Sequence, residues 1–159
     1  EAKAREEEAI KAGKTIDDGT YTIVSALNKK LVLDVKGAGK SNSTNVQICT
    51  SNNSKAQKFK ITYNTSKKAY RIVNINANKS LDVKGAKTAN KTNVQIYTSN
   101  NSCAQFWKIQ KNSNGTFTLI STCGNKVLDV YGGIAKNSTN VQIYSSNGTK
   151  AQQWTFKKV

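Results

Sequence analysis

Three blocks of 27 residues in this chain align with one another without a gap. The first two blocks are identical at 19 of the 27 positions, and each of them is identical to the third at 16. The blocks begin 48 and then 47 residues apart, at Leu33, Leu81 and Leu128. Self-similarity at a fixed period is the signature of a repeated structural unit. The chain is therefore expected to build one fold from three copies of that unit.

Each copy alternates apolar and polar residues with a period of two, as around Leu81 and Val83, around Val94 and Ile96, and around Trp107 and Ile109. This period indicates β-strands, and the Gly, Ser and Asn residues between the alternating segments suit turns. About four short strands are expected in each repeat, and no helix after residue 19. Three four-stranded units are too few for a propeller, which typically has four or more blades. An all-β closed barrel with three-fold symmetry is the predicted architecture.

The composition narrows the classes of function. A chain of 159 residues suits one domain, and no apolar run approaches the length of a membrane span, so a soluble globular protein is expected. The chain has no His, which excludes Ser-His and Cys-His nucleophile pairs and metal sites that contain His. No catalytic residue, metal or cofactor is predicted, and the protein is not expected to be an enzyme.

Positive charge is concentrated in the repeats. The formal net charge is +16, and residues 19–159 carry 21 bases and only three acids. Such a field favours anionic partners and makes association with them dependent on salt, although it can also serve solubility alone. The lysines are scattered, and no Arg follows Arg71. This distribution argues against nucleic acid as the partner.

Every repeat contains Leu-Asp-Val and ends in Gln-x-aromatic, as Gln57-Lys58-Phe59, Gln105-Phe106-Trp107 and Gln152-Gln153-Trp154. In these motifs, residues 19–159 resemble the ricin B-type β-trefoil lectin domain, with repeats at about 19–67, 68–114 and 115–159. The resemblance implies twelve strands in a six-stranded barrel capped by three hairpins, and up to three sugar sites. It is closest to bacterial carbohydrate-binding modules attached to secreted glycosidases or cell-wall hydrolases, an implication that rests on analogy.

The only three acids of the body, Asp34, Asp82 and Asp129, occupy the same place in the three repeats. Leu81 and Val83 flank Asp82, so if they enter the core the carboxylate points outward, toward solvent. One interpretation is that the aspartates hold turns by bonding to backbone amides. The other is that each carboxylate accepts charge-assisted hydrogen bonds from two neighbouring sugar hydroxyls. Three-fold symmetry would separate the carboxylates by more than the roughly 5 to 10 Å of a glycosidase pair.

Tyr97 and Tyr144 follow Val-Gln-Ile and are expected on the face opposite the core. There the ring can stack on a pyranose or simply cover the barrel edge. An Asn stands three residues after each of these positions, namely Asn52, Asn100 and Asn147, and its amide can donate to and accept from hydroxyls.

The glutamines Gln57, Gln105 and Gln152 are expected to face inward and satisfy buried backbone groups. In the family, the glutamine at this place also borders the ligand aspartate. The preceding residue, often a sugar-contacting Asn in the family, is Ala56, Ala104 or Ala151 here.

The first repeat departs furthest from the family's pattern, because it has Cys49 in place of the aromatic residue and Phe59 in place of Trp. Its site, formed by Asp34, Asn52 and Gln57, is expected to be weak or inactive. The family's disulfide within a repeat is absent. Antiparallel pairing centred near residue 113 would bring Cys103 and Cys123 close enough for a disulfide, with Cys49 left free, but the sequence leaves open whether they are bonded.

Residues 1–18 are expected to form a linker or tail. Strong helix formers with acid–base neighbours at helical spacing predict a helix over residues 1–14, ended by Gly13. A linker to an upstream domain suits a binding module. Because the chain shows no signal peptide and starts at Glu1, a processed or excised fragment is one expectation, and a secreted or cell-surface location follows from the family alone.

The sequence thus predicts a non-catalytic lectin module that tethers a larger protein to glycans, either galactose-like sugars or polysaccharides such as a cell-wall polymer. The active sites are expected to be Asp82, Tyr97, Asn100 and Gln105, and Asp129, Tyr144, Asn147 and Gln152. The alternative is a polyanion-binding trefoil for teichoic acid, acidic glycan or nucleic acid. If the chain is a lectin module, it is not expected to insert into a membrane. Because the lysines are scattered, it is also not expected to bind nucleic acid.

Overall fold

The computed structural model describes residues 13–159. Within these residues, twelve strands follow one another. They are β1 (Gly19–Ser25), β2 (Leu31–Val35), β3 (Val46–Thr50), β4 (Phe59–Asn64), β5 (Ala69–Asn74), β6 (Lys79–Val83), β7 (Val94–Tyr97), β8 (Trp107–Lys111), β9 (Phe117–Ser121), β10 (Val127–Val130), β11 (Thr139–Tyr144) and β12 (Trp154–Lys158). The prediction of an all-β chain with four strands in each repeat is confirmed.

Six single-turn 3₁₀ helices separate the strands, where no helix was predicted. They are η1 (Lys36–Ala38), η2 (Lys55–Gln57), η3 (Lys84–Ala86), η4 (Cys103–Gln105), η5 (Tyr131–Gly133) and η6 (Lys150–Gln152). η1, η3 and η5 turn on a central glycine in the left-handed region, with φ of 61°, 64° and 59°. Turns of three residues are too short to carry the apolar periodicity by which helices are predicted.

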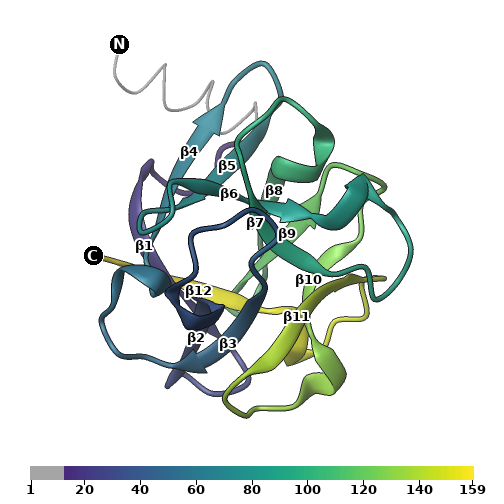
Figure 1. Ribbon diagram of the computed structural model, residues 1–159. Coiled ribbons are helices and arrows are strands. Elements are labelled where there is room, and N and C mark those ends of the chain that lie inside the picture. The colour runs from purple at the N-terminus through teal and green to yellow at the C-terminus, as the bar shows by residue number, and fades with distance from the viewer. Residues whose placement is uncertain (1–12) are drawn as a thin grey trace.

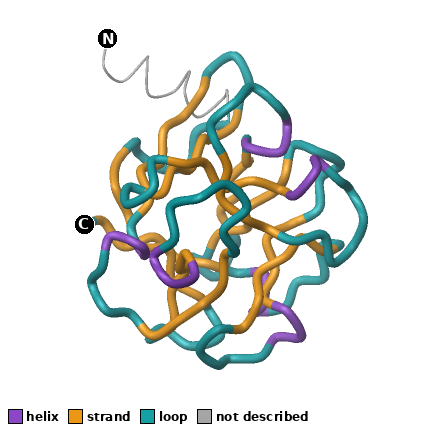
Figure 2. Tube along the Cα trace, in the orientation of Figure 1, coloured by secondary structure: helices purple, strands orange, loops and turns teal. Residues whose placement is uncertain are grey.

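Six strands close a barrel. β1 pairs with β4, β4 with β5, β5 with β8, β8 with β9, β9 with β12, and β12 with β1, all antiparallel. The other strands form three hairpins, β2–β3, β6–β7 and β10–β11. Figure 1 shows the three repeats arranged about the centre of the view in order of colour, and Figure 2 shows the loops that connect the strands. The result is a β-trefoil.

The hairpins meet on the pseudo-three-fold axis through a closed ring of three asparagine side chains. Asn45 donates to Asn140 (2.8 Å), Asn140 to Asn93 (2.9 Å) and Asn93 to Asn45 (2.8 Å). Each amide oxygen accepts one of these hydrogen bonds, and each nitrogen donates one. The three repeats are therefore joined side chain to side chain by a residue that all three copies share.

The core of the barrel is formed by the alternating apolar residues and the aromatic residue of each Gln-x-aromatic motif. Phe59, Trp107 and Trp154 are fully buried. Trp107 donates from Nε1 to the carbonyl of Leu81 (3.1 Å), and Trp154 donates to that of Leu128 (3.3 Å). These bonds join the end of each motif to the strand that carries the aspartate. Phe59 has no such donor, so the first repeat lacks this link.

The chain before β1 is attached to the barrel from Thr15 onward. The Tyr70 hydroxyl accepts hydrogen bonds from the backbone N–H groups of Thr15 (2.7 Å) and Ile16 (2.9 Å). The helix expected over residues 1–14 lies outside the described residues except for its last two, of which Gly13 has a φ of 96°. Within residues 13–159, no helix has the length and apolar character needed to cross a membrane.

Candidate functional site

Each of the three aspartates is the second-to-last residue of the first strand of its hairpin, opposite a glutamine of the second strand. Gln47 donates to Asp34 (2.9 Å), Gln95 to Asp82 (3.0 Å) and Gln142 to Asp129 (2.8 Å). These glutamines were not among the predicted site residues. The signal was present, because each follows its aspartate by 13 residues in all three repeats.

The prediction that the aspartates point toward solvent is wrong in one respect. Their side chains leave the apolar core, as the alternation requires, but Asp34, Asp82 and Asp129 are only 7%, 5% and 6% exposed. The glutamine of the opposite strand donates a hydrogen bond to each carboxylate. Each is therefore a buried acceptor, not a surface charge.

The glutamines of the Gln-x-aromatic motif are also buried, as predicted, and clamp the loop before them. Gln105 accepts from the backbone N–H of Asn100 (2.7 Å) and donates to the carbonyl of Thr98 (2.9 Å). Gln57 and Gln152 make the corresponding pairs of bonds, with Asn52 and Thr50 and with Asn147 and Ser145. Gln105 also donates to the second oxygen of Asp82 (3.0 Å). It thus fixes both the loop and the carboxylate.

The pKa values of Asp82 and Asp129 are raised above the ordinary value of 3.8. Burial is the main cause, because a carboxylate removed from water loses solvation. Hydrogen bonds from Gln105 and Gln95 to Asp82, and from Gln142 and Gln152 to Asp129, partly oppose the shift by stabilising the charged form.

The two tyrosines point away from the core. Tyr97 is 37% exposed and Tyr144 is half-buried. A loop of the preceding repeat holds the residue after each ring: the Asn42 side chain accepts from the N–H of Thr98 (2.8 Å), and Asn90 accepts from that of Ser145 (2.8 Å). The position of each ring therefore depends on two repeats.

The asparagines after the tyrosines are exposed, and their side-chain oxygens are already used locally. Asn100 accepts from the N–H of Ser102 (3.0 Å), and Asn147 accepts from that of Thr149 (3.1 Å). Their amide nitrogens have no partner among the described residues. These asparagines therefore offer mainly a donor to a ligand, where the sequence predicted both a donor and an acceptor.

Two pockets bring these residues together. One, of about 280 Å³, is lined in the second repeat by Asp82, Gln95, Tyr97, Asn100 and Ser102, among others. The other, of about 440 Å³, is lined in the third repeat by Asp129, Gln142, Tyr144, Asn147 and Thr149, among others. The small residues Ala104 and Ala151 also line the pockets, whereas the predicted site residues Gln105 and Gln152 do not. Each pocket combines a carboxylate, an aromatic ring and an amide donor.

The first repeat keeps the polar framework but not the ring. Asp34, Gln47, Asn52 and Gln57 make bonds like those of the other repeats, while the half-buried free thiol of Cys49 stands in the place of tyrosine. No aromatic face is available there for a sugar ring.

Cys103 and Cys123 form a disulfide with their Cα atoms 5.1 Å apart, so the possibility that the sequence left open is realised. Cys103 begins η4, directly before the buried Ala104 and Gln105. The disulfide therefore joins the turn that positions Gln105 to the chain after β9.

One residue that supports the second site could not be predicted from the repeats, because only the second repeat has it. The half-buried Arg71 donates to Ser80 (3.1 Å), to the side-chain oxygen of Gln105 (3.0 Å) and to the carbonyl of Asn100 (2.7 Å). Its guanidinium group lies 4.6 Å from the centre of the Phe106 ring.

The sequence model of the ricin-type β-trefoil lectin domain-like family matches residues 10–97, 64–144 and 104–159. No curated protein matches the chain closely. Among solved structures, the designed three-fold symmetric protein ThreeFoil has a TM-score of 0.85 at 27% identity, over 89% of this chain and 100% of that one.

Two further solved structures are similar. The exo-β-1,3-galactanase 1,3Gal43A from Clostridium thermocellum has a TM-score of 0.82 at 25% identity, over 92% of this chain and 31% of the galactanase. The Macrolepiota procera ricin B-like lectin, in complex with lactose, has a TM-score of 0.77 at 20% identity, over 92% of this chain and 100% of the lectin. By its family match and its three repeats, the chain belongs to the ricin-type β-trefoil lectin domain-like family.

Proposed function

We propose that this chain is a non-catalytic carbohydrate-binding module that tethers a larger secreted or cell-surface protein to glycans. The observation that carries the proposal is the combination, in two of three repeats, of a buried carboxylate and a tyrosine in the wall of one pocket. The second and third pockets are the sites, and the first is impaired.

The chemistry of such a pocket suits a neutral sugar. A carboxylate reached only through the pocket can accept from two adjacent hydroxyls, and charge-assisted bonds are stronger than neutral ones. The Tyr97 or Tyr144 ring offers an apolar face, and the free amide of Asn100 or Asn147 adds a donor. Such shallow sites are expected to bind with about millimolar Kd.

The similar structures support a sugar ligand and a modular context. The Macrolepiota procera lectin has the same fold and was solved with lactose. In the Clostridium thermocellum galactanase, the similar part makes up 31% of the chain. We therefore favour galactose-like glycans as ligands and a catalytic or surface protein as the tethered partner.

A glycan array with the isolated chain tests this function. Binding is expected on galactose-terminated or polymeric glycans, and a variant with both Asp82→Asn and Asp129→Asn should not bind. An array on which no glycan binds the native chain, or binds it no better than this variant, would refute the proposal.

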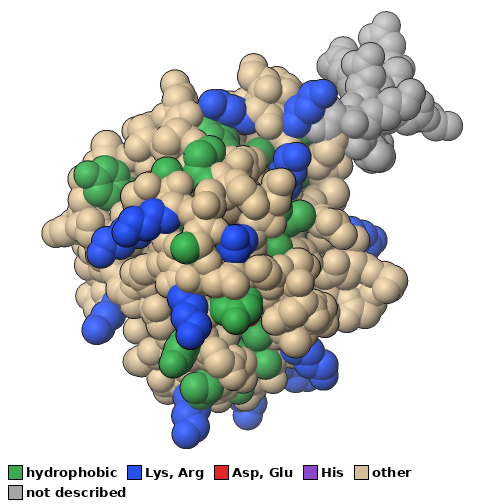
Figure 3. All heavy atoms as spheres, turned by 90° about the vertical axis from the view of Figure 1, so that its right-hand side faces the viewer, with side chains coloured by type: hydrophobic (Ala, Val, Ile, Leu, Met, Phe, Trp, Pro, Cys, Tyr) green, Lys and Arg blue, Asp and Glu red, His purple; other side chains and the backbone are tan. Residues whose placement is uncertain are grey.

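A second candidate, a polyanion-binding trefoil, is favoured by the surface charge. Asp34, Asp82 and Asp129 are the only acids of residues 19–159, and all three are buried. In the face shown in Figure 3, Lys and Arg are scattered and no acidic side chain is visible. A salt titration separates the candidates: binding to a polyanion falls steeply as salt rises, whereas stacking and hydrogen bonding to a neutral sugar change little.

A further inference from the structure

Three of the residues that line the third pocket give it a different chemistry from the second, around a shared framework. Lys91 stands where the other repeats have Ser43 and Ser138. Tyr131 stands where they have Lys36 and Lys84, and Lys150 where they have Lys55 and Cys103. All three of these residues line the pocket, together with Asp129 and Tyr144. The third pocket thus has two cations and a second aromatic ring.

The backbone at residue 91 is fixed against the third repeat. Its N–H donates to the carbonyl of Ile143 (2.8 Å), directly before Tyr144, and its φ is 71°. Ser43 makes the same bond to Ile96 (2.9 Å) with a φ of 70°, and Ser138 makes it to Ile48 (2.8 Å) with a φ of 68°. The lysine is therefore carried to the site by a loop with the same backbone in every repeat, and serine can occupy the position.

The charges in this pocket are separated. The carboxylate of Asp129 is buried beneath Gln142, while Lys91 and Lys150 are exposed. Lys91 reaches the pocket from the loop before β7, whereas Asp129 lies on β10, so the two charges come from different elements. Among residues 13–159, neither lysine forms an ion pair with a carboxylate. Their charges are available to a ligand.

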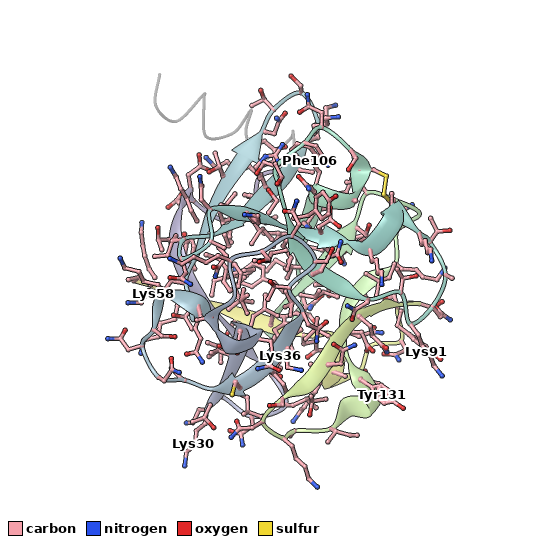
Figure 4. All side chains as sticks on the ribbon, viewed as in Figure 1. Lys30, Lys36, Lys58, Lys91, Phe106 and Tyr131 are labelled. Carbon is pink, nitrogen blue, oxygen red and sulfur yellow. A yellow bond between two sulfur atoms is a disulfide. The ribbon has the colours of Figure 1, made fainter. Side chains whose placement is uncertain are left out.

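We propose that the third pocket selects glycans that carry an anionic substituent, a carboxylate or a sulfate, and that Lys91 contacts this substituent. The inference rests on the proposed function and names the substrate class of one of its sites. Asp129 and Asn147 bind hydroxyls, Tyr144 and the 47% exposed Tyr131 contact the sugar faces, and Lys91, assisted by Lys150, binds the anion. Figure 4 shows Lys91 and Tyr131 on the same side of the molecule.

The second pocket provides the internal comparison. It is lined by Asp82, Tyr97 and Asn100, and Lys84, which stands at the place of Tyr131, is not among its lining residues. A neutral sugar is therefore expected to bind both pockets, whereas an acidic sugar gains affinity only in the third. An exposed ion pair of this kind gives about a threefold gain in affinity at low salt, and added salt reduces it.

The test is a titration followed by NMR of the backbone amides of Tyr144 and Tyr97, which report the two pockets separately. The probes are lactose, lactose sulfated on galactose, and sialyllactose. For the native chain, at least one acidic probe should bind more tightly than lactose when binding is followed at Tyr144. When binding is followed at Tyr97, neither acidic probe should bind more tightly than lactose. The two acidic probes show whether sulfate or carboxylate is preferred.

Matched variants assign the effect to one residue. Lys91→Ser, the residue of the other two repeats, should abolish the preference for acidic probes at Tyr144. Lys30→Ser removes the same charge from an exposed loop outside both pockets and should leave the preference intact. Ser43→Lys should create the preference at Tyr97.

The outcomes are distinguishable. If lactose shifts both amides but the acidic probes bind no tighter, or if the preference survives Lys91→Ser, the inference is wrong and the proposed function stands. If Lys30→Ser removes the preference as fully as Lys91→Ser, overall charge is the cause and the inference is wrong. If none of the probes shifts either amide, galactoside binding itself is refuted.

Discussion

At the scale of single residues, Asp82 is held from two sides, with Gln95 on one carboxylate oxygen and Gln105 on the other. Asp82→Asn keeps the shape but replaces an acceptor with an amide, whose nitrogen would face a glutamine donor. We expect loss of sugar binding in the second pocket and a free energy of unfolding lower by about 1–3 kcal/mol. Titration with lactose, observed at Tyr97 and Tyr144, and urea unfolding measure the two effects.

Asp34→Asn is the control for this prediction. Asp34 has the equivalent bond from Gln47 but lies beside Cys49, where no aromatic ring is present. Its replacement should lower stability by a similar amount and leave glycan binding nearly unchanged. If Asp34→Asn reduces glycan binding more than Asp82→Asn does, the assignment of the second pocket as active and the first as impaired is wrong.

The raised pKa values of Asp82 and Asp129 predict the pH dependence of binding. Both carboxylates should take up a proton at a pH above the ordinary value of 3.8, and the neutral acids lose their charge-assisted bonds to hydroxyls. Affinity for lactose should therefore begin to fall before an ordinary aspartate would titrate.

Stability should respond to pH in the opposite sense. Because the folded-state pKa of each group is raised, its contribution to stability is greatest when it is protonated and is lost as pH rises through the folded-state pKa. These two groups therefore do not cause unfolding while binding declines. Far-UV circular dichroism across the titration provides the check, and an affinity that stays flat down to pH 3.8 would contradict the assignment.

The outward direction of Asp82 and Tyr97 follows from alternation and could be predicted from the sequence. The burial of Asp82 could not, because it depends on Gln95 across the hairpin and on Gln105, 23 residues away. Alternation gives the face of a strand but not what covers that face.

At the scale of elements, the second repeat has an internal support that the others lack. Arg71 on β5 joins β6 to the loop before η4 by bonding to Ser80, Gln105 and the Asn100 carbonyl, and it stacks on Phe106. The corresponding residues in β1 and β9 are Thr22 and Thr118. The second repeat is therefore expected to depend on Arg71 in a way that the first and third do not.

Replacing this arginine by the residue of the other repeats tests that dependence. Arg71→Thr should lower the free energy of unfolding by about 1–2 kcal/mol, since it removes hydrogen bonds and a cation–π contact. It should also weaken lactose binding at Tyr97 while leaving Tyr144 unchanged. Lys60→Thr, which removes an exposed lysine from β4 beside β5, is the control and should change binding at neither pocket. If Arg71→Thr weakens lactose binding equally at both pockets, Arg71 does not act specifically on the second pocket.

The strands of each repeat could be predicted because their apolar period of two is strong and recurs three times. The short turns η1 to η6 could not, because three residues are too few to show an apolar period. Three of them, η1, η3 and η5, depend on a glycine in the left-handed region. Arg71 shows a further limit, since a contact present in one repeat leaves no trace in the pattern that the repeats share.

At the scale of the whole molecule, the ring of Asn45, Asn93 and Asn140 joins the three repeats on the axis. The sequence shows that the three residues correspond but not that they meet, because the meeting requires all three hairpins to be in place. Asn93→Ala removes two of the three bonds and leaves one donor and one acceptor unpaired. We expect a loss of about 1–3 kcal/mol in the free energy of unfolding.

Asn101→Ala is the matched control for the ring. Asn101 is exposed, and its side chain makes no hydrogen bond among the described residues. Urea unfolding of the two variants gives the comparison. If they lose the same stability, the ring contributes nothing beyond the loss of any asparagine side chain.

The arrangement of the pockets about one axis leads to the last prediction, which concerns retention on a polymer. Two millimolar sites on one rigid barrel hold a multivalent glycan far better than either site alone, because the second binding event is intramolecular. On a matrix that displays galactose densely, Asp82→Asn or Asp129→Asn alone should reduce retention by much more than twofold. The double variant should elute with the void. On a matrix with sparse ligands the native chain, with two independent sites, should be retained at most about twofold more than either single variant. If the native chain is retained equally on dense and sparse matrices, avidity is not the mechanism.

If the double variant is still retained at low salt and released by added salt, the interaction is carried by the positive charge of residues 19–159, and the polyanion-binding function takes precedence.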